Sequence, residues 1–168
     1  MSTTTLDWTY APAPETTDPQ IKPRYDLFID GRFVKGAAYR TILNPATAEP
    51  LCEVADATPA EVDRAVKAAR RAYEKVWSKL PGRERGKFIF RLARLLQERA
   101  REFAVAESKN GGKPIRESRD VDVPLAAAHF FYYAGWADKL AYAFPGARAR
   151  PVGVCGQVIP WNFPLLMA

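Results

Sequence analysis

Apolar residues recur at helical spacing along three stretches of the chain. The first starts at Thr58-Pro-Ala-Glu61, where threonine can cap free N–H groups, proline suits the first helical position, and glutamate can reach back. It runs to about Trp77, and the second follows the break at Pro81-Gly82 and ends near Gly111-Gly112. The pattern predicts that these two helices pack as a hairpin. A third helix is predicted over residues 121–144, with these side chains available for burial: Leu125, Ala128, Phe131, Tyr132, Trp136 and Leu140.

Shorter runs of β-prone residues lie before and after the helices. Residues 25–34 place two such runs around Asp30-Gly31, a dipeptide that favours a tight hairpin turn. A turn is predicted at Asn44-Pro-Ala-Thr47, followed by a short strand over residues 50–54. Residues 152–159 form a continuous apolar run, typical of a strand buried on both faces of a parallel sheet. We expect this last strand to lack a partner within the chain.

The N-terminal segment differs from the rest in composition. Residues 1–23 combine prolines with threonine, aspartate and alanine and contain few apolar side chains. Such a segment cannot bury enough apolar surface to fold by itself, so we expect a mobile arm. Residues 24–168 are then one folded unit, and 168 residues suffice for one core of ordinary size.

The formal net charge of +6 raises the question of a polyanionic partner. Most of the excess falls on the second predicted helix, where glutamates interrupt the basic residues Arg83, Arg85, Lys87, Arg91, Arg94, Arg99 and Arg101. This interleaving favours a solvated helix face with internal ion pairs over a nucleic-acid surface, and no recognition module is evident. The sequence also has no membrane-length apolar run and no secretion signal, so no membrane partner and a cytoplasmic location are expected.

Cysteine and histidine usage argues against a metal site or a disulfide framework. The chain has two cysteines, far apart, and one histidine, so we expect no bound metal and a reducing compartment. Cys155 lies between glycines in the apolar run and is interpreted as a small core residue, since no base or helix start adjoins it. Cys52 lies in an edge-like strand and His129 in an aromatic, alanine-rich helix, where packing is the favoured role.

Two further motifs suggest chemistry and are better explained by structure. Gly111-Gly112-Lys113-Pro114 lacks the upstream glycine and following serine or threonine of a phosphate loop, so a helix-ending turn is favoured. Asp120 and Asp122 could form a carboxylate pair, but residues two apart on a helix do not face each other. Capping of the following helix is the favoured role for these aspartates.

The segment Pro160-Trp161-Asn162-Phe163-Pro164 is a stronger candidate for function. It follows the apolar run, and ligands of open α/β sheets bind beyond the carboxyl ends of the strands. Two prolines restrict the backbone, so the Asn162 amide can be held in a fixed direction as a donor to a developing oxyanion. Asparagine is also a good helix cap, and the residues alone favour neither role.

The sequence resembles the NAD(P)-dependent aldehyde dehydrogenase superfamily from about Tyr25 onward. The most specific matching stretch is Gly153-Val-Cys-Gly-Gln-Val-Ile-Pro-Trp-Asn-Phe-Pro164. Supporting stretches follow in the family's order: Leu27–Val34, Asn44–Thr47, Val62–Tyr73, Gly112–Pro114 and Tyr133–Lys139. Residues 129–133 and 142–146 are most similar to the family-sixteen type. The resemblance implies an α/β fold: the N-terminal part of the dehydrogenase fold, with helical pairs, a small β element and the start of a Rossmann-like parallel sheet.

The resemblance also implies roles for individual residues. In such enzymes a cysteine thiolate attacks the aldehyde, the thiohemiacetal passes hydride to the nicotinamide of NAD or NADP, and the thioester is hydrolysed. The residue matching Asn162 donates its amide to the oxyanion, which favours the catalytic role over the cap. The remaining matched residues lie against the cofactor (Ile159, Pro160 and Trp161) or line the substrate tunnel (Phe163 and Met167).

The same resemblance implies that the chain is truncated. The family's nucleophile, general base and ribose-binding residues match positions beyond Ala168, and Cys155 precedes the loop and cannot replace the nucleophile. The 168 residues are therefore expected to be inactive alone and to belong to a larger enzyme, a homo-oligomer in this family. The alternative is a non-catalytic dehydrogenase-like assembly module. The aldehyde and the choice between NAD and NADP stay open.

Overall fold

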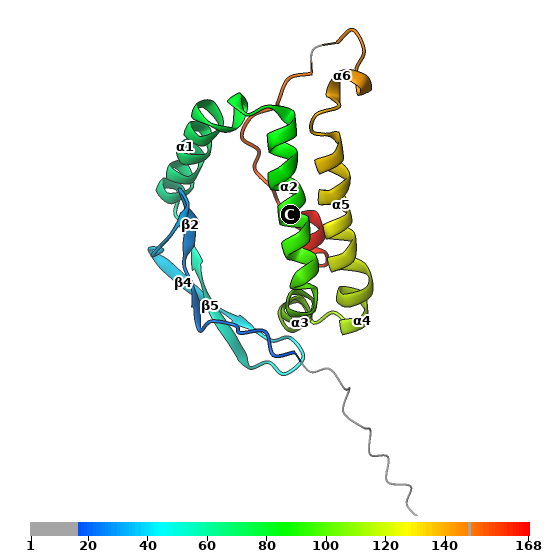
Figure 1. The fold of residues 1–168 in the computed structure, drawn as a ribbon. Coiled ribbons are helices and arrows are strands. Elements are labelled where there is room, and N and C mark those ends of the chain that lie inside the picture. Colours follow the sequence, from blue (N-terminus) through cyan, green and yellow to red (C-terminus); the bar gives the residue numbers. More distant parts are fainter. Residues whose placement is uncertain (1–16, 148) are drawn as a thin grey trace, which may run out of the picture.

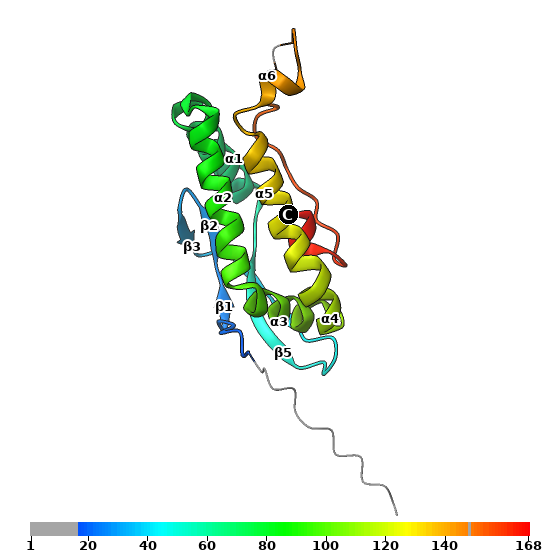
Figure 2. The same ribbon diagram turned by 45° about the vertical axis from the view of Figure 1, so that its right-hand side comes forward.

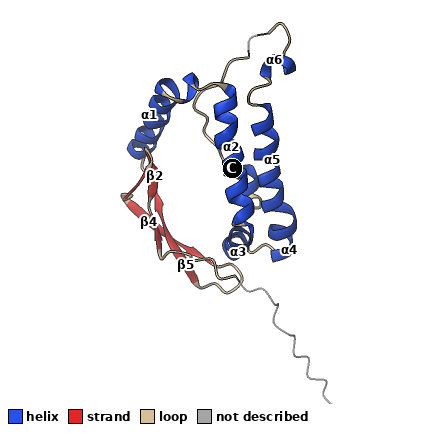
Figure 3. Cartoon of the chain, in the orientation of Figure 1, coloured by secondary structure: helices blue, strands red, loops and turns tan. Residues whose placement is uncertain are grey.

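A small sheet and a hairpin form the N-terminal part of the fold. The computed structural model describes residues 17–147 and 149–168. A three-stranded sheet has the order β1-β5-β4, with β1 parallel and β4 antiparallel to β5, and β2 and β3 form a separate antiparallel pair. The strands are β1 (Arg24–Tyr25), β2 (Leu27–Ile29), β3 (Arg32–Val34), β4 (Ala38–Leu43) and β5 (Pro50–Asp56). The sheet lies on one side of the molecule, and the helices formed by residues 82–136 lie on the other (Figures 1 and 3).

The predicted turns of the β element are confirmed. Asp30 and Gly31 both take positive φ, 56° and 77°, as a tight hairpin turn requires. At the second turn the backbone N–H of Ala46 donates to Asn44 Oδ1 at 3.0 Å, and that of Ala48 donates to the Asn44 carbonyl at 2.8 Å. The expected edge position of Cys52 is wrong, because β5 is the middle strand of its sheet.

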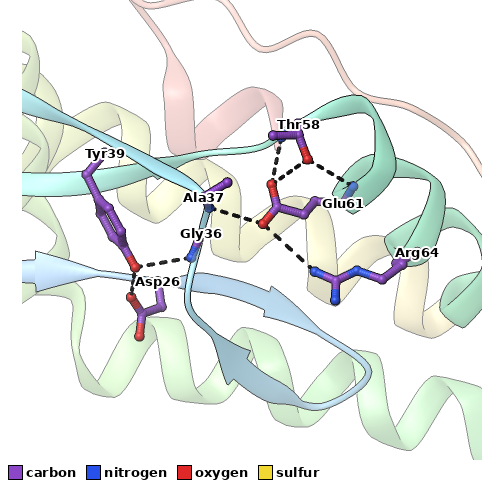
Figure 4. A network of polar contacts seen from close by, with 7 residues as sticks. All are labelled: Asp26, Gly36, Ala37, Tyr39, Thr58, Glu61 and Arg64. Carbon is purple, nitrogen blue, oxygen red and sulfur yellow. Dashed lines mark hydrogen bonds and ion pairs between the residues drawn. The ribbon is translucent and has the colours of Figure 1, made fainter.

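The predicted capping box starts helix α1 (Pro59–Lys75) and ties it to the sheet. The Thr58 N–H donates to Glu61 Oε2 at 2.8 Å, while the Glu61 N–H donates to Thr58 Oγ1 at 3.4 Å. The other oxygen of the buried Glu61 carboxylate accepts from the Ala37 N–H at 3.2 Å and faces Arg64 (Figure 4). Hydrogen bonds from Thr58 are the main reason that the pKa of Glu61 is lowered. The Tyr39 hydroxyl on β4 donates to Oδ1 of Asp26, which lies between β1 and β2, at 2.5 Å and so links these parts of the β element.

Replacing Thr58 with alanine is expected to lower the free energy of unfolding by about 1 kcal/mol, the usual loss for a helix N-cap. Urea denaturation of the variant measures the change. Thr58→Ser is the matched control, because it keeps the hydroxyl that accepts from the Glu61 N–H. An equally large loss of unfolding free energy in Thr58→Ser would show that removal of the N-cap is not the cause of the loss in Thr58→Ala.

The remaining helices follow a 3₁₀ turn, η1 (Trp77–Lys79). They are α2 (Gly82–Glu98), α3 (Ala100–Gly111), α4 (Ile115–Glu117), the π-helical turn η2 (Ser118–Asp122), α5 (Val123–Trp136), α6 (Leu140–Ala143) and α7 (Pro164–Met167). Helices α2 and α5 run side by side, and α3 crosses beneath them (Figures 1 and 2). Basic residues of α2 form ion pairs such as Lys87–Glu84 and Arg94–Glu98, as predicted for a solvated face.

Two predictions about the first helices are wrong. The second helix is not continuous, since it breaks at Arg99, where α2 ends and α3 begins. Helix α1 does not pack along α2 as a hairpin; α2 packs along α5 instead, and α1 lies beside the sheet (Figure 1). Gly86 permits this packing, because a Cβ at this position would come within 2.9 Å of the Ala134 carbonyl oxygen.

The third predicted helix is also wrong in its bounds and in its buried face. Helical backbone begins earlier, at Ile115, and is interrupted before α6. Of the predicted side chains, Phe131 packs as expected, with its ring 4.9 Å from that of Phe90 on α2. The others are exposed: Leu125, Ala128, Tyr132, Trp136 and Leu140. The fully buried residues of α5 are instead small: Ala126, Ala127 and Ala134, together with Val123. Helix α5 is apolar nearly all round, so its spacing does not reveal which face packs.

The predicted buried strand over residues 152–159 is absent from the described chain. This segment has no strand pairing, and two of its three valines are open to solvent, Val152 at 92% and Val158 at 99% exposure. A strand forms only where neighbours satisfy its backbone N–H and C=O groups, and no other described segment lies alongside as a strand. The predicted α/β fold is confirmed, and among the described residues its strands lie in the N-terminal sheet and hairpin, while the segment expected to begin a parallel Rossmann-like sheet is not a strand.

The described part of the N-terminal arm, residues 17–23, contacts the helices. Pro19 is buried, and Asp18 lies 3.4 Å from the Lys109 ammonium on α3. Most of the predicted arm, residues 1–16, lies outside the described residues.

Candidate functional site

The loop over residues 160–163 is held between an extended segment and the short helix α7. The chain returns from α6 along the long helices, and α7 then lies against α5 (Figure 1). Helix α7 begins at Pro164, its N-cap position is Phe163, and no side chain caps it. The cap role considered for Asn162 is therefore wrong. Asn162 is exposed, so its amide is available to another molecule or segment.

A cavity of about 250 Å³ lies beside this loop. Its wall combines the loop with the end of α3 and the turn that follows, through Glu107, Gly111, Gly112, Lys113, Trp161, Asn162 and Pro164. The turn is the predicted helix end: Gly112 takes a left-handed φ of 72°, and its N–H donates to the Ser108 carbonyl at 2.9 Å. Residues about 50 positions apart in sequence therefore meet at one site.

Lys113 connects the helical layer to the loop. Its ammonium forms a short ion pair with Asp122, a residue that is 0% exposed. The same ammonium lies 4.1 Å from the centre of the Phe163 ring, a cation–π geometry. The predicted helix cap at Asp122 is wrong, since Asp122 makes no cap bond to α5 and pairs with Lys113 instead. Asp120 forms an exposed ion pair with Arg119.

Glu107 is a buried residue in the wall of the cavity. The residue is 7% exposed, and neither carboxylate oxygen has a hydrogen-bond partner among the described residues. Burial is the main cause that raises the pKa of Glu107, and the negative charge of Asp122 adds to it. Lys113 and the nearby backbone of Leu165 act in the opposite direction, without forming a hydrogen bond to this carboxyl. Glu107 therefore favours its protonated form more than an ordinary glutamate does.

Glu107→Gln is expected to become more stable relative to the wild type as pH rises. Because the pKa of Glu107 is raised in the folded state, protonated Glu107 adds to the free energy of unfolding below the usual pKa of 4.5. This contribution is lost as pH rises through the folded-state pKa. Glutamine removes that loss. Urea unfolding from about pH 4 to about pH 8 measures the difference. Glu102→Gln is the control on the same helix. Arg99 lowers the pKa of Glu102, so this variant should become less stable relative to the wild type as pH rises. The same pH trend in both variants would contradict the raised pKa of Glu107.

The structure brings some predicted site residues together and separates others. Trp161 and Asn162 line the cavity, and Phe163 contacts Lys113 from beside it. Met167 lies apart, in a hollow of about 200 Å³ that also includes His129, which is exposed and not packed as expected. Two more residues precede the loop and do not line the cavity: Ile159, half-buried, and Pro160, exposed.

Cys155 is not the core residue that the sequence predicts. It is exposed, because the strand that would bury it does not form, and its Sγ lies 3.8 Å from the Gly153 carbonyl. Across residues 17–147 and 149–168, histidine, cysteine and acidic side chains form no cluster of three that could hold a metal ion. No helix in this part of the chain is long and apolar enough to cross a membrane.

Sequence reasoning missed the charged side of the cavity. Glu107 lies three residues after Ala104 on the buried face of α3, so its signal is an acidic residue at an apolar position of the helical repeat. Lys113 was considered as a phosphate ligand and Asp122 as a cap, whereas the structure pairs them. Their pairing depends on how η2 folds back on α3, which local spacing does not indicate.

Comparison with known proteins identifies the family. The profile described as "Aldehyde dehydrogenase family" matches residues 33–168. Retinal dehydrogenase 2 of Homo sapiens is 41% identical over 89% of this chain and 31% of its own length, and an aldehyde dehydrogenase of Alternaria alternata is 43% identical over 84% and 30%. A Bacillus cereus aldehyde dehydrogenase solved as an NAD+ complex has a TM-score of 0.80 and 36% identity, covering 90% of this chain and 35% of that one. This chain spans about a third of the length of these relatives, and it belongs to the aldehyde dehydrogenase family.

Proposed function

We propose that this chain contributes the oxyanion-binding loop of an enzyme that oxidises an aldehyde to a carboxylic acid with NAD(P). The observation that carries the proposal is the setting of Asn162. Its side chain is exposed in the wall of a cavity, and the helix that follows does not use it as a cap. Lys113 also contacts the adjacent Phe163, so the loop is supported from the helical layer.

Asn162 has one role in the proposed reaction. When a thiolate attacks the aldehyde carbon, the carbonyl oxygen gains negative charge, and a neutral amide N–H directed at that oxygen lowers the barrier. The attack forms a thiohemiacetal, which loses hydride to give a thioester, and water then releases the acid and restores the thiol. Cys155 lies outside the cavity, which supports our proposal that the thiol and the general base are supplied by other parts of the complete enzyme.

The residues before Asn162 fit contact with a nicotinamide cofactor, which would accept the hydride. Trp161 is 84% exposed, and Pro160 is exposed beside it, so both offer apolar surface next to the amide donor. Half-buried Ile159 would support this surface from behind. A relative of matching fold is known as an NAD+ complex, which supports the assignment.

The residues after Asn162 would lie on the substrate side. Phe163 and Met167 are separated by one turn of α7, and Met167 is exposed in its own apolar hollow. We place both along the substrate tunnel of the complete enzyme. We further propose that the complete enzyme is a homo-oligomer and works in the cytoplasm. The homo-oligomer is supported by exposed aromatic residues such as Tyr132, Tyr133 and Phe90, which leave apolar surface for further protein contacts.

The 168-residue chain is expected to form no NADH or NADPH from aldehyde by itself. One oxyanion donor cannot replace a nucleophile and a base. Absorbance at the reduced-nicotinamide band, with short aliphatic and aromatic aldehydes, measures this. Turnover above buffer would contradict the proposed division of the active site, and loss of that turnover in Cys155→Ser or Cys52→Ser would identify the nucleophile within this chain.

A non-catalytic assembly module is the second candidate, and the exposed apolar faces of α2 and α5 favour it. The coding sequence after Ala168 separates the two. A downstream cysteine motif and glutamate support the enzyme, whereas a stop codon directly after Ala168 supports the module.

A further inference from the structure

Three charged side chains converge behind the loop from different elements. Glu107 comes from α3, Lys113 from the turn after α3, and Asp122 from η2. Glu107 and Asp122 are buried, and the Lys113 side chain is 16% exposed. Burying charges costs free energy unless they are paired, so this arrangement restricts where the Lys113 ammonium can lie.

The position of that ammonium is defined from two sides. Asp122 holds it by a short ion pair, and the face of the Phe163 ring lies 4.1 Å away. Asp122 is itself part of η2, which packs against α3 and α5, so the anchor belongs to the helical layer. Phe163 directly follows Asn162, and α7 directly follows Phe163. A constraint on the ring therefore acts on the backbone that carries the amide donor.

We propose that Lys113 is a positioning residue for the oxyanion loop: anchored by Asp122, it holds the Phe163 ring and thereby fixes the direction of the Asn162 amide. The oxyanion role of residues 160–163 rests on the proposed function, whereas the contacts of Lys113 with Asp122 and Phe163 do not depend on it. Lys113 touches no reacting atom in this role. Its effect passes through Phe163, and the reaction depends on it because an amide donor must already point at the developing charge.

Nuclear magnetic resonance of the ¹⁵N-labelled 168-residue chain tests this directly, without any catalysis. The side-chain amide of Asn162 and the indole N–H of Trp161 report the loop, and their signals are assigned by their loss in Asn162→Asp and Trp161→Phe. In Lys113→Met both signals are expected to move toward disordered-peptide positions. A cation over a partly buried ring is worth enough to change the closed-to-open ratio about tenfold.

Matched variants separate positioning from general support. Lys113→Arg keeps the cation and is expected to restore both signals, and Lys109→Met removes an exposed lysine of α3 and is expected to leave them unchanged. Phe163→Leu keeps the Lys113–Asp122 pair but removes the ring, so it should displace the loop signals even if Lys113→Met fails to fold.

The proposal is overturned if the Asn162 and Trp161 signals keep their wild-type positions in folded Phe163→Leu. It is also overturned if Lys113→Met destabilises the chain while its folded fraction keeps those positions, because Lys113 would then be only structural. These signals do not depend on catalysis. If the proposed enzymatic function were wrong, the expected changes in the Asn162 and Trp161 signals would still occur, so its failure is distinguishable from failure of the positioning proposal.

Discussion

Lys113→Met is expected to lower the free energy of unfolding of the chain by about 3 kcal/mol, because it leaves Asp122 as a buried charge without its partner. Asp122 has 0% exposure, and its second carboxylate oxygen has no hydrogen-bond partner among the described residues. Without the Lys113 ammonium, no ion pair offsets the free-energy cost of burying the Asp122 carboxylate. Urea denaturation followed by circular dichroism measures the loss.

Lys109→Met is the matched control for this loss. Lys109 forms an exposed ion pair with Asp18, and pairs of this kind contribute less than about 1 kcal/mol. The double variant Lys113→Met with Asp122→Leu should recover part of the lost stability, since an apolar pair needs no compensation. Equal losses in the Lys113 and Lys109 variants would show that the buried pair carries no special weight.

Asn162→Ala is expected to lower kcat at least about 100-fold in the complete enzyme while leaving stability nearly unchanged. The amide donates to an oxygen that becomes negative only during the reaction, so KM should change far less than kcat. The side chain is exposed and caps no helix, so unfolding of the 168-residue chain should shift by less than about 0.5 kcal/mol.

Steady-state kinetics of a hybrid enzyme can measure this effect, with residues 24–168 replacing the matching segment of an aldehyde dehydrogenase relative. Cys155→Ser is the control, because Cys155 lies outside the cavity and should leave kcat unchanged. A stability loss of about 1 kcal/mol in Asn162→Ala with unchanged kcat would instead indicate a structural cap.

Local signals predicted the parts of the fold that depend on neighbouring residues. The Asp30-Gly31 turn, the Asn44 turn and the Thr58 capping box each need only a few adjacent residues, and each is present in the structure. The break at Arg99 was not predictable in this way. No proline or glycine marks it, and α3 changes direction where it meets η2 and α5.

The errors share a physical cause, which is that apolar spacing does not say what covers an apolar face. Helix α5 packs through alanines against the α2 side while Leu125 and Tyr132 face solvent. Residues 152–159 are apolar enough for a buried strand, but a strand needs at least one neighbouring strand to pair with its backbone, and the described chain supplies none there. Exposed Val158 and Cys155 follow directly from the absence of such neighbours in the described chain.

The candidate site was predicted in part. The segment around Asn162 came from its composition and from the family resemblance, and the structure places Trp161 and Asn162 together in a cavity wall. The charged residues behind it, Glu107, Lys113 and Asp122, came only from the structure, because they are brought together by the packing of α3 against η2.

Aldehyde-dependent formation of reduced nicotinamide by the hybrid enzyme tests the central claim most directly. The claim is that residues 24–168 supply the oxyanion side of an aldehyde dehydrogenase active site. The predicted result is turnover comparable to that of the parent relative, with no turnover when the relative's remaining part is assayed without this segment. A hybrid that folds and binds cofactor but oxidises no aldehyde accepted by the relative would contradict the claim.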